Sequence, residues 1–410
     1  MIKIDELLKN EKVEWRKLGT LLDYEQPSKY IVESTEYDDR YATPVLTAGQ
    51  TFILGFTNEV ENIYKADKNN PVIIFDDFTS GNQWVDFDFK VKSSAMKMLK
   101  PKEGVNLRYC YHYIQTISID TTEHKRLWIS RFSQIEIPIP SDIKTQEKIA
   151  KILDKFTDCV TELQAELQAR TKQYEYYRNL LLSEEYLNKL SENPEILGGG
   201  YRVKLTTLGD IGFFTRGNGL QKKDFLLKGN PVIHYGQIYT QYGFETDKTI
   251  AFVSDDVFSK LKKAKYKDIL IATTSENIED VGKAVVWIGY EEIGFSGDMY
   301  SYRTTENSKY IAYYFQTTEF QKQKERKVTG TKLIRIHGDD MAKFSISLPP
   351  IEIQNKVVEI LDKFQSLLFD TKGLLPQEIE LRQKQYEYYR ERLLTFDIES
   401  ETISRQTDNI

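Results

Sequence analysis

The sequence predicts an α+β protein with a pseudo-twofold internal repeat, in which two mixed, strand-rich domains are separated by two long helices packed as an antiparallel coiled coil. The heptapeptide Lys-Gln-Tyr-Glu-Tyr-Tyr-Arg at residues 172–178 recurs letter for letter at 384–390 (the tyrosine strings). Ile-Leu-Asp-Lys-Phe at 152–156 recurs at 360–364 (the aspartate strings). Apolar residues around these strings alternate at spacings of four and three, as in a coiled coil. Because both strings recur at almost the same distance along the sequence, they indicate a duplicated supersecondary unit.

The composition is that of an ordinary globular protein. A chain of 410 residues, 40% hydrophobic and 29% charged, predicts two to four structural units. It has no apolar run of about 18 residues and no secretion-signal pattern at its start, so we expect a cytoplasmic protein with no membrane partner. Cys110 and Cys159 are interpreted as small core residues, and the four histidines are scattered, which disfavours a metal site.

The formal net charge of −6 is unevenly distributed along the chain. Residues 141–200 carry 8 basic and 11 acidic side chains, and residues 350–410 carry 8 and 12. The remaining segments are therefore close to neutral. They can carry local basic patches of the kind that bind nucleic acid.

The first mixed domain is predicted at residues 1–142. Residues 71–75 (Pro-Val-Ile-Ile-Phe) form the short apolar run of a buried strand. Residues 84–91 alternate apolar and polar side chains over eight positions, which predicts a half-buried strand. The prolines at 138 and 140 exclude helix and predict a last extended segment at 135–140.

A long helix is predicted at residues 143–193, with Ser141 or Asp142 as its N-cap. Its apolar positions alternate at spacings of four and three, a seam interrupted by Arg170. Most of this segment would form a helix about 70 Å long. The seam needs a partner, and the second copy of the strings supplies a matching one.

The second half of the chain repeats this order. Its predicted parts are a mixed domain at 200–349 with strands at 267–272 and 282–288, a C-terminal coiled-coil helix at 350–396, and a disordered tail at 397–410. Arg382 interrupts the second seam as Arg170 interrupts the first. Gly373 and Pro376 are expected to interrupt or kink the second helix, because proline lacks the backbone donor and crowds the preceding turn.

This layout resembles the specificity (S) subunits of type I restriction-modification enzymes. The resemblance covers nearly the whole chain and rests on the duplicated strings, the proline-ended strands at 138–140 and 349–350, and the segments 43–49 and 273–283. It implies a non-catalytic reader of double-stranded DNA. Each of its two target recognition domains would read one half of a split, asymmetric target.

The resemblance also implies partners and cofactors. The helices would set the distance between the half-sites and dock two methyltransferase (M) subunits, to which two restriction (R) motor-nuclease subunits can add. S-adenosylmethionine would then belong to the M subunits, and ATP and Mg²⁺ to the R subunits. The resemblance implies no cofactor on this chain itself.

Base and phosphate contacts need cationic, amide and hydroxyl side chains on rigid loops. In the first domain the candidates are Lys29, Gln50, Ser80, Asn82, Gln83, Lys125 and Arg126. In the second domain they are Arg216, Asn218, Gln221, Lys222, Lys223, Tyr239, Tyr242, Lys327, Thr331 and Lys332. Loops of this composition also occur on surfaces that bind nothing, so an ordinary solvated surface is the alternative interpretation of these residues.

The tyrosine strings have two readings. Tyr174 and Tyr177 fall on the seam and are expected to fill the coiled-coil core. Tyr176 and Arg178, with their repeats Tyr388 and Arg390, fall off the seam and are candidates for subunit docking.

The sequence leaves two other classes of function to consider, an enzyme and a structural scaffold. Asp77, Asp88 and Lys90 have the order of a Mg²⁺-dependent nuclease site, but the pattern is short and Asp88 lies where a solvated polar residue is expected. No glycine-rich cofactor loop follows a strand, which disfavours methyl transfer by this chain. A non-catalytic coiled-coil scaffold that joins two protein-binding domains is the remaining alternative.

Overall fold

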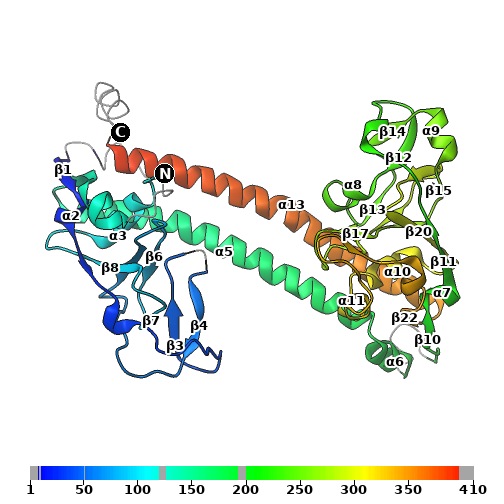
Figure 1. Cartoon of the computed structure of the whole chain (residues 1–410), viewed down its shortest axis with the longest axis horizontal. Coiled ribbons are helices and arrows are strands. Elements are labelled where there is room, and N and C mark those ends of the chain that lie inside the picture. Colours follow the sequence, from blue (N-terminus) through cyan, green and yellow to red (C-terminus); the bar gives the residue numbers. More distant parts are fainter. Residues whose placement is uncertain (1–7, 9–10, 50, 120–125, 193–199, 397–410) are drawn as a thin grey trace. The chain divides into compact units, whose positions relative to one another are not determined.

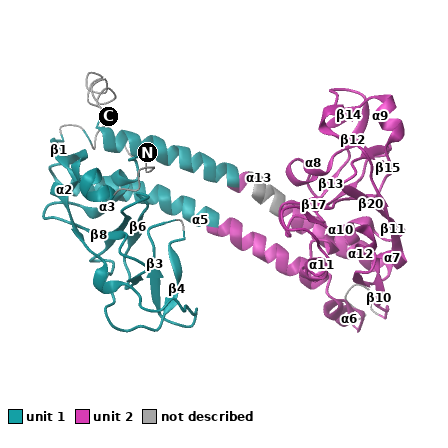
Figure 2. Ribbon diagram, in the orientation of Figure 1, with its two compact units in different colours: residues 1–164, 376–410 teal, residues 165–375 magenta. Residues whose placement is uncertain are grey.

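The computed structural model describes residues 8, 11–49, 51–119, 126–192 and 200–396, without the side chains of 368–373. The chain forms two compact units (Figure 2): unit 1 comprises residues 1–164 and 376–410, and unit 2 comprises residues 165–375. Each unit holds one mixed domain and part of each long helix (Figure 1). Within the described residues, no helix is both long and apolar enough to span a membrane. The predicted tail at 397–410 lies outside the described residues.

The domain of unit 1 is organised by a four-stranded antiparallel sheet in the order β2-β8-β5-β6. Its strands are β2 (Leu22–Glu25), β8 (Met96–Pro101), β5 (Val72–Asp76) and β6 (Asn82–Val85). A second sheet joins β4 (Ile53–Thr57), β3 (Thr43–Leu46) and β7 (Lys90–Val91), and β1 (Val13–Lys17) pairs with β9 (Glu136–Pro140). The helical segments are α2 (Leu18–Leu21), η1 (Ser28–Tyr30), α3 (Leu107–Ile114), α4 (Leu127–Ser130) and η2 (Phe132–Gln134).

The single strand predicted at residues 84–91 is wrong. The alternation is split between β6, which pairs with β5, and β7, which pairs in parallel with β3. The chain changes sheets here because Phe89 and Val91 pack, fully buried, in the apolar cluster that contains Leu46 of β3. A period of two in the sequence predicts extended backbone, but it does not predict which sheet that backbone joins.

The domain of unit 2 is organised by a five-stranded sheet in the order β11-β20-β16-β18-β13. Its strands are β11 (Gly212–Arg216), β20 (Met299–Thr304), β16 (Ile269–Ala272), β18 (Ala284–Trp287) and β13 (Glu245–Thr246). A second sheet joins β14 (Ala251–Val253), β12 (Asn230–Ile233), β19 (Ile293–Phe295) and β15 (Lys263–Ala264), and a smaller pair joins β17 (Thr274–Ser275) to β21 (Ile334–Arg335). β10 (Lys204–Thr207) pairs with β22 (Ser345–Leu348).

The helical segments of unit 2 surround these sheets. They are α6 (Glu184–Glu192), α7 (Leu208–Ile211), η3 (Lys222–Asp224), α8 (Tyr235–Thr240), α9 (Asp255–Lys260), α10 (Ser308–Tyr314), α11 (Thr318–Glu325) and α12 (Gly338–Met341). The repeat extends to strand register: Val72 lies opposite Val85 in unit 1, as Ile269 lies opposite Val286 in unit 2. The central sheet β2-β8-β5-β6 therefore corresponds to β11-β20-β16-β18, and α3 corresponds to α10.

The first long helix, α5 (Ile143–Leu181), has 39 residues and a length of about 58 Å. Asp142 begins it, because its side chain accepts a hydrogen bond from the Lys144 amide at 3.0 Å. The helix ends short of the predicted residue 193. Leu182 is drawn into the apolar core of unit 2, and Ser183 then caps the separate helix α6 by accepting a hydrogen bond from the Tyr186 amide at 3.2 Å.

The second long helix, α13 (Ile351–Thr395), has 45 residues and contains Pro376. The helix is therefore not interrupted at Gly373 and Pro376, and the alternative expectation, a kink there, stays a prediction. Proline removes one backbone donor, and apolar packing on both sides of it holds the helix: Leu361 is buried in unit 2, and Leu393 is buried in unit 1.

The duplicated strings meet crosswise. In unit 1 the ring of Phe156, from the first aspartate string, stacks on Tyr389, from the second tyrosine string, with ring centroids 5.0 Å apart. In unit 2 Phe364, from the second aspartate string, stacks on Tyr177, from the first tyrosine string, at 5.3 Å. Each unit therefore contains one string from each half of the chain. The segments of α5 and α13 in each unit run antiparallel, as predicted (Figure 2).

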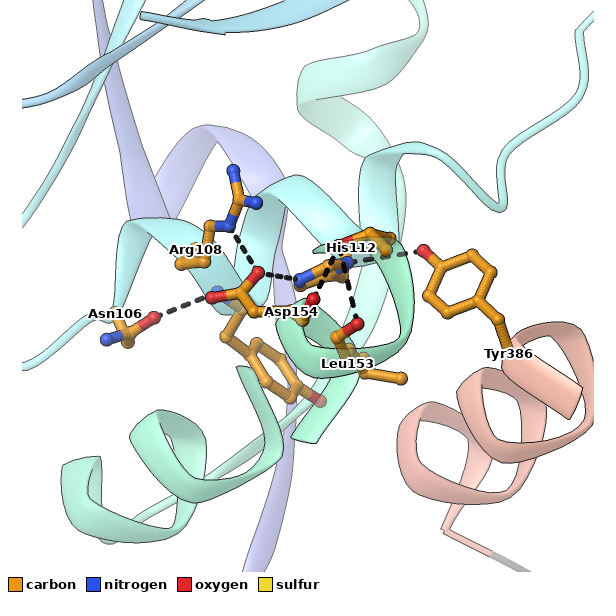
Figure 3. Close-up of polar contacts among 8 residues, drawn as sticks. Asn106, Arg108, His112, Leu153, Asp154 and Tyr386 are labelled. Atoms are coloured by element: carbon orange, nitrogen blue, oxygen red, sulfur yellow. Dashed lines mark hydrogen bonds and ion pairs between the residues drawn. The ribbon is translucent and has the colours of Figure 1, made fainter. Parts of the chain in front are cut away.

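A polar junction ties the domain of unit 1 to both helical segments (Figure 3). Asp154, from the first aspartate string, accepts from Arg108 Nε at 2.6 Å and lies 2.8 Å from His112 Nε2, both on α3. The other ring nitrogen of His112 lies 3.2 Å from the hydroxyl of Tyr386, in the second tyrosine string. His112 is fully buried. Three helices thus converge on one imidazole.

Unit 2 builds the same junction from different residues. Asp362, in the second aspartate string, pairs with Lys309 Nζ at 2.6 Å and accepts a hydrogen bond from the Tyr313 hydroxyl at 2.7 Å. Lys309 and Tyr313 occupy the places on α10 that Arg108 and His112 occupy on α3. The aspartate of the duplicated string therefore holds the domain helix in both units.

The junction shifts the acid–base properties of its members. Burial lowers the pKa of His112, and this outweighs the opposite effect of the Asp154 carboxylate. Burial would raise the pKa of Asp154, but hydrogen bonds from His112 and Arg108 hold it below its ordinary value. A neutral His112 can donate from Nε2 to Asp154 and accept at Nδ1 from Tyr386, which satisfies both ring nitrogens.

Replacing His112 with glutamine should flatten the pH dependence of the stability of unit 1 in mildly acidic solution. Because the folded-state pKa of His112 is lowered, the unfolded chain takes up this proton first when the pH falls below about 6.5. In the wild type, the contribution of neutral His112 to the free energy of unfolding is therefore fully present above that pH and is lost as the pH falls below it. Glutamine keeps a donor for Asp154 and does not titrate.

The measurement is the thermal unfolding midpoint of both proteins between about pH 7.5 and pH 5. His234, whose pKa burial also lowers, is present in both proteins, so their difference isolates His112. Equal pH slopes would show that His112 does not change its protonation on folding.

Candidate nucleic-acid interface

Candidate residues of unit 1 gather at one end of its central sheet. This end is defined by the register, which places Glu25 opposite Met98, Asp76 opposite Met96, and Phe75 opposite Asn82. Lys29 is exposed on η1, just after β2; Ser80 lies in the turn between β5 and β6; and Asn82 and Gln83 are the first two residues of β6. The antiparallel register therefore brings side chains from distant segments to one edge.

A buried carboxylate places Arg126 at the same end. Asp77 follows β5 and accepts hydrogen bonds from the amides that begin α4: Leu127 N to its carbonyl at 2.7 Å, and Trp128 N to its Oδ1 at 2.8 Å. Arg126 is the exposed residue before that helix. Lys97 Nζ lies 3.1 Å from Asp77 Oδ2, and both side chains are buried. The ion pair therefore compensates the charge that fixes this loop.

The turn at residues 79–82 is held in an unusual conformation. Ser80 has φ of 60°, in the left-handed region, and the Asn82 side chain donates to the Ser80 carbonyl at 3.2 Å. A Cβ on Gly81 would lie 2.5 Å from the carbonyl oxygen of Ala48, so only glycine lets the two loops approach. The loop after β3, which carries Gln50, therefore packs against this turn. Gln50 and Lys125 themselves lie outside the described residues.

Unit 2 presents the corresponding end of its sheet. There Arg216 lies opposite Tyr300, and Ala272 lies opposite Met299. Arg216 is exposed, and its Nε donates to the Gly297 carbonyl at 3.4 Å. The exposed lysines Lys222 and Lys223 lie in η3, directly after Gln221, and Lys222 is close enough to His234 to lower its pKa further, after the larger effect of burial.

The hairpin at residues 327–335 joins this end through β17. Thr274 pairs with Arg335 in the β17–β21 ladder, and its hydroxyl donates to Asp298 Oδ1 at 3.3 Å. Lys327, Thr331 and Lys332 are exposed on the hairpin.

Arg335 is also exposed here, and it was not among the sequence candidates. The Thr-Gly-Thr sequence at 329–331 is typical of a turn, and it could have indicated a hairpin here. In the structure Gly330 has φ of 96°, and Thr329 forms a β-bridge with Arg335 across the turn.

Three candidates of unit 2 are engaged inside the domain. Asn218 donates to the Lys260 carbonyl at 2.5 Å and accepts from the Lys262 amide at 2.8 Å, so it fixes a neighbouring loop. Tyr242 is buried, and its hydroxyl accepts from the Ile250 amide at 3.0 Å. The Tyr239 hydroxyl donates to the Thr274 carbonyl at 2.9 Å, and burial raises its pKa well above the ordinary value. Their polar groups are engaged in hydrogen bonds within the domain and support the loops at this end of the sheet.

In the tyrosine strings the exposure of the tyrosines agrees with the prediction, whereas that of Arg178 does not. Tyr174 is buried, whereas Tyr176 and Tyr388 are 62% and 53% exposed. Arg178 was expected to be available off the seam, but it is only 9% exposed, because it lies over the Tyr174 ring and donates to Gln316 on the domain side. Its repeat Arg390 lies over the Tyr386 ring and is half-buried.

The sequence matches the family described as "Type I restriction modification DNA specificity domain" over residues 10–173 and 202–381. It is 39% identical over 419 residues to the EcoR124I/EcoR124II type I restriction enzyme specificity subunit of Escherichia coli, covering 98% of this chain and 99% of that protein. The chain belongs to the type I restriction-modification specificity family.

Solved structures agree with this assignment at the level of the fold. The crystal structure of a type I restriction-modification S subunit from M. genitalium has a TM-score of 0.55 and 16% identity, covering 94% of this chain and 97% of that chain. A second structure, from work on complex assembly and conformational transition of a type I system, has a TM-score of 0.50 at 16% identity and covers 93% and 97%. The predicted fold class is therefore confirmed.

The structure does not bring together the three residues of the nuclease alternative, Asp77, Asp88 and Lys90. Asp77 follows the end of β5 that lies opposite Asn82, whereas Asp88 comes after the other end of β6. Asp88 pairs with Lys65 at 2.6 Å, and the buried Lys90 pairs with Glu59 at 2.5 Å. Among the described residues, no group of three or more histidines, cysteines or carboxylates is arranged to hold a metal ion.

Replacing Asp77 with alanine should destabilise unit 1 by about 3–5 kcal/mol, because Lys97 would be left as a buried charge without its counter-ion. The matched control is Asp88→Ala, which removes an exposed ion pair and should change stability little. Guanidinium unfolding followed by circular dichroism measures both. Equal, small losses would show that the Asp77–Lys97 pair does not hold the α4 loop.

Proposed function

We propose that this chain is the DNA-reading subunit of a type I restriction-modification complex, and that each unit reads one half of a bipartite target. One observation carries the proposal: the same end of the same sheet presents exposed polar and basic loops in both repeats. Lys29 and Arg126 lie at that end in unit 1, and Arg216 and Arg335 lie at it in unit 2. A duplicated reader predicts two half-sites separated by a spacer that it does not read.

We further propose that the chain binds and positions while its partners perform the chemistry. The relative from E. coli is named as a specificity subunit of a restriction enzyme, and the second structural neighbour comes from work on complex assembly. By this proposal two methyltransferase subunits dock on the helices and bring S-adenosylmethionine. Two restriction subunits bring ATP and Mg²⁺, and the complex acts on DNA in the cytoplasm.

The direct test compares the chain with and without its methyltransferase partner. The pair should retain DNA in a sequence-specific, salt-sensitive manner and methylate a split motif, because phosphate contacts release counter-ions. The chain alone should neither methylate nor cut DNA. A scaffold that joins two protein-binding domains would give no specific DNA retention in either sample.

Exchanging residues 201–349 for the equivalent domain of a related subunit should change one half of the methylated motif and leave the other half unaltered. The physical reason is that the reading residues of unit 2 are placed by its own sheet and by the β17–β21 pair. Long-read sequencing of methylated DNA measures the motif. The matched control exchanges residues 1–142 instead, which should change the opposite half. A change in both half-sites from either exchange would refute independent reading.

Inserting Ala-Glu-Leu-Gln after Gln168 should lengthen the spacer by one or two base pairs and keep both half-site sequences. The insertion follows the near-tandem segments Thr-Glu-Leu-Gln at 161–164 and Ala-Glu-Leu-Gln at 165–168, within α5. Four residues add about 6 Å of helix, the length of about two base-pair steps, and they rotate the seam by only about 40°. An active enzyme with an unchanged spacer would show that this helix does not set the distance.

A further inference from the structure

The first and second tyrosine strings each border a surface pocket. In unit 2 a pocket of about 560 Å³, here called the α10 pocket, is lined by Glu175 and Arg178 of the first tyrosine string and by the end of α10. In unit 1 a pocket of about 290 Å³, the α3 pocket, is lined by Glu387 and Arg390 of the second tyrosine string and by the end of α3. The glutamate and arginine occupy the same places in the repeated heptapeptide. Each pocket lies entirely within one unit.

The α10 pocket contains buried polar atoms that the described residues leave unsatisfied. Arg178 donates from one terminal nitrogen to Gln316 Oε1 at 3.3 Å, but its Nε has no hydrogen-bond partner. Gln365, on the α13 wall, has a buried Oε1 that also lacks a partner. Such groups are rare in folded proteins, because each loses its bonds to water without replacement. Both atoms are themselves inaccessible from the pocket, so they mark a polar wall and are not contact points for an occupant.

The charge of the pockets indicates what kind of segment would occupy them. Four carboxylates line the α10 pocket, from Glu175, Glu279, Asp280 and Glu325, against the two cations Arg178 and Lys283. The buried Lys324 lies behind this wall and interacts electrostatically with three of the four, so a single negative charge remains in excess. None of the four forms a salt bridge within the part of the chain that the structure describes.

The α3 pocket has the same sign of charge. It has two carboxylates, Glu387 and Glu391, against the single cation Arg390. These surfaces repel a phosphate backbone and attract lysine or arginine. Their charge therefore favours a basic protein segment over DNA.

Building on the proposed function, we propose that each pocket receives a lysine- or arginine-bearing segment of one methyltransferase subunit. The duplication of the site accounts for two copies of one partner, one bound to each unit. Tyr176 and Tyr388 follow the two pocket glutamates and are the large exposed aromatics of the strings, so they supply the apolar contact beside each charged anchor. The second tyrosine of the string contacts the partner, and the first and third build the core.

The test uses the full-length chain, its purified methyltransferase partner and reversal of single charges. Glu175→Lys changes the α10 pocket, Glu387→Lys changes the α3 pocket, and the double variant changes both. Glu352→Lys is the matched control, because Glu352 is an exposed carboxylate of α13 that lines neither pocket. Glu325→Lys tests the opposite wall of the α10 pocket without altering α5. Native mass spectrometry counts bound copies, and calorimetry gives the affinity of each site.

The wild type and Glu352→Lys should bind two copies of the methyltransferase. Glu175→Lys and Glu387→Lys should each keep one copy and bind the other about tenfold or more weakly, and the double variant should lose both. Glu325→Lys should behave as Glu175→Lys does. Unchanged melting curves would show that the variants remain folded.

Two full-affinity copies on either single pocket variant, or the loss of both copies from one substitution, would overturn the inference. It would leave the DNA-reading role untouched. A wild-type chain that binds no methyltransferase would overturn the proposed function, and this inference with it.

Discussion

The structure depends on the crossed pairing of the duplicated strings. Each unit takes its aspartate string from one half of the sequence and its tyrosine string from the other, through the Phe156–Tyr389 and Phe364–Tyr177 ring stacks. Neither half of the chain can therefore complete a unit alone, because the partner helix segment arrives from the other half. The two repeats are therefore interdependent in folding.

The aspartates of the strings connect that pairing to the domains. Asp154 and Asp362 hold the domain helices α3 and α10, through Arg108 and His112 in unit 1 and through Lys309 and Tyr313 in unit 2. The carboxylate is kept while its partners differ, because several donors can satisfy one partly buried acceptor at the same place. Each domain is thus fixed to the helices by hydrogen bonds whose geometry tolerates little rotation. Within each unit, the domain is therefore tied to its own helix segments.

The reading ends show a second use of buried charge. Asp77 is part of no converged catalytic set; with its charge compensated by Lys97, it orders the loop that carries Arg126. In unit 2, hydrogen bonds from Asn218 and Tyr239 likewise order neighbouring loops. Rigid support beneath exposed cations and amides lowers the ordering cost of contacting DNA. A specificity subunit therefore needs these interior polar residues as much as the residues that would touch bases.

The sequence alone determined the repeat, the fold class, the buried strand at β5, the coiled-coil seam and the family resemblance. Local patterns predict these features: identical strings, apolar residues that recur every two or about every three and a half positions, and prolines that exclude helix. Patterns of this kind specify an element and its apolar face.

They do not specify which distant element covers that face. Only the tertiary structure decided that residues 84–91 divide between two sheets, that α13 continues through Pro376, and that Arg178 turns into its own domain. Arg335 joined the reading end for the same reason, because strand pairing carried it there from elsewhere in the sequence. Burial and long-range packing set these outcomes, and they depend on contacts that no single stretch of sequence contains.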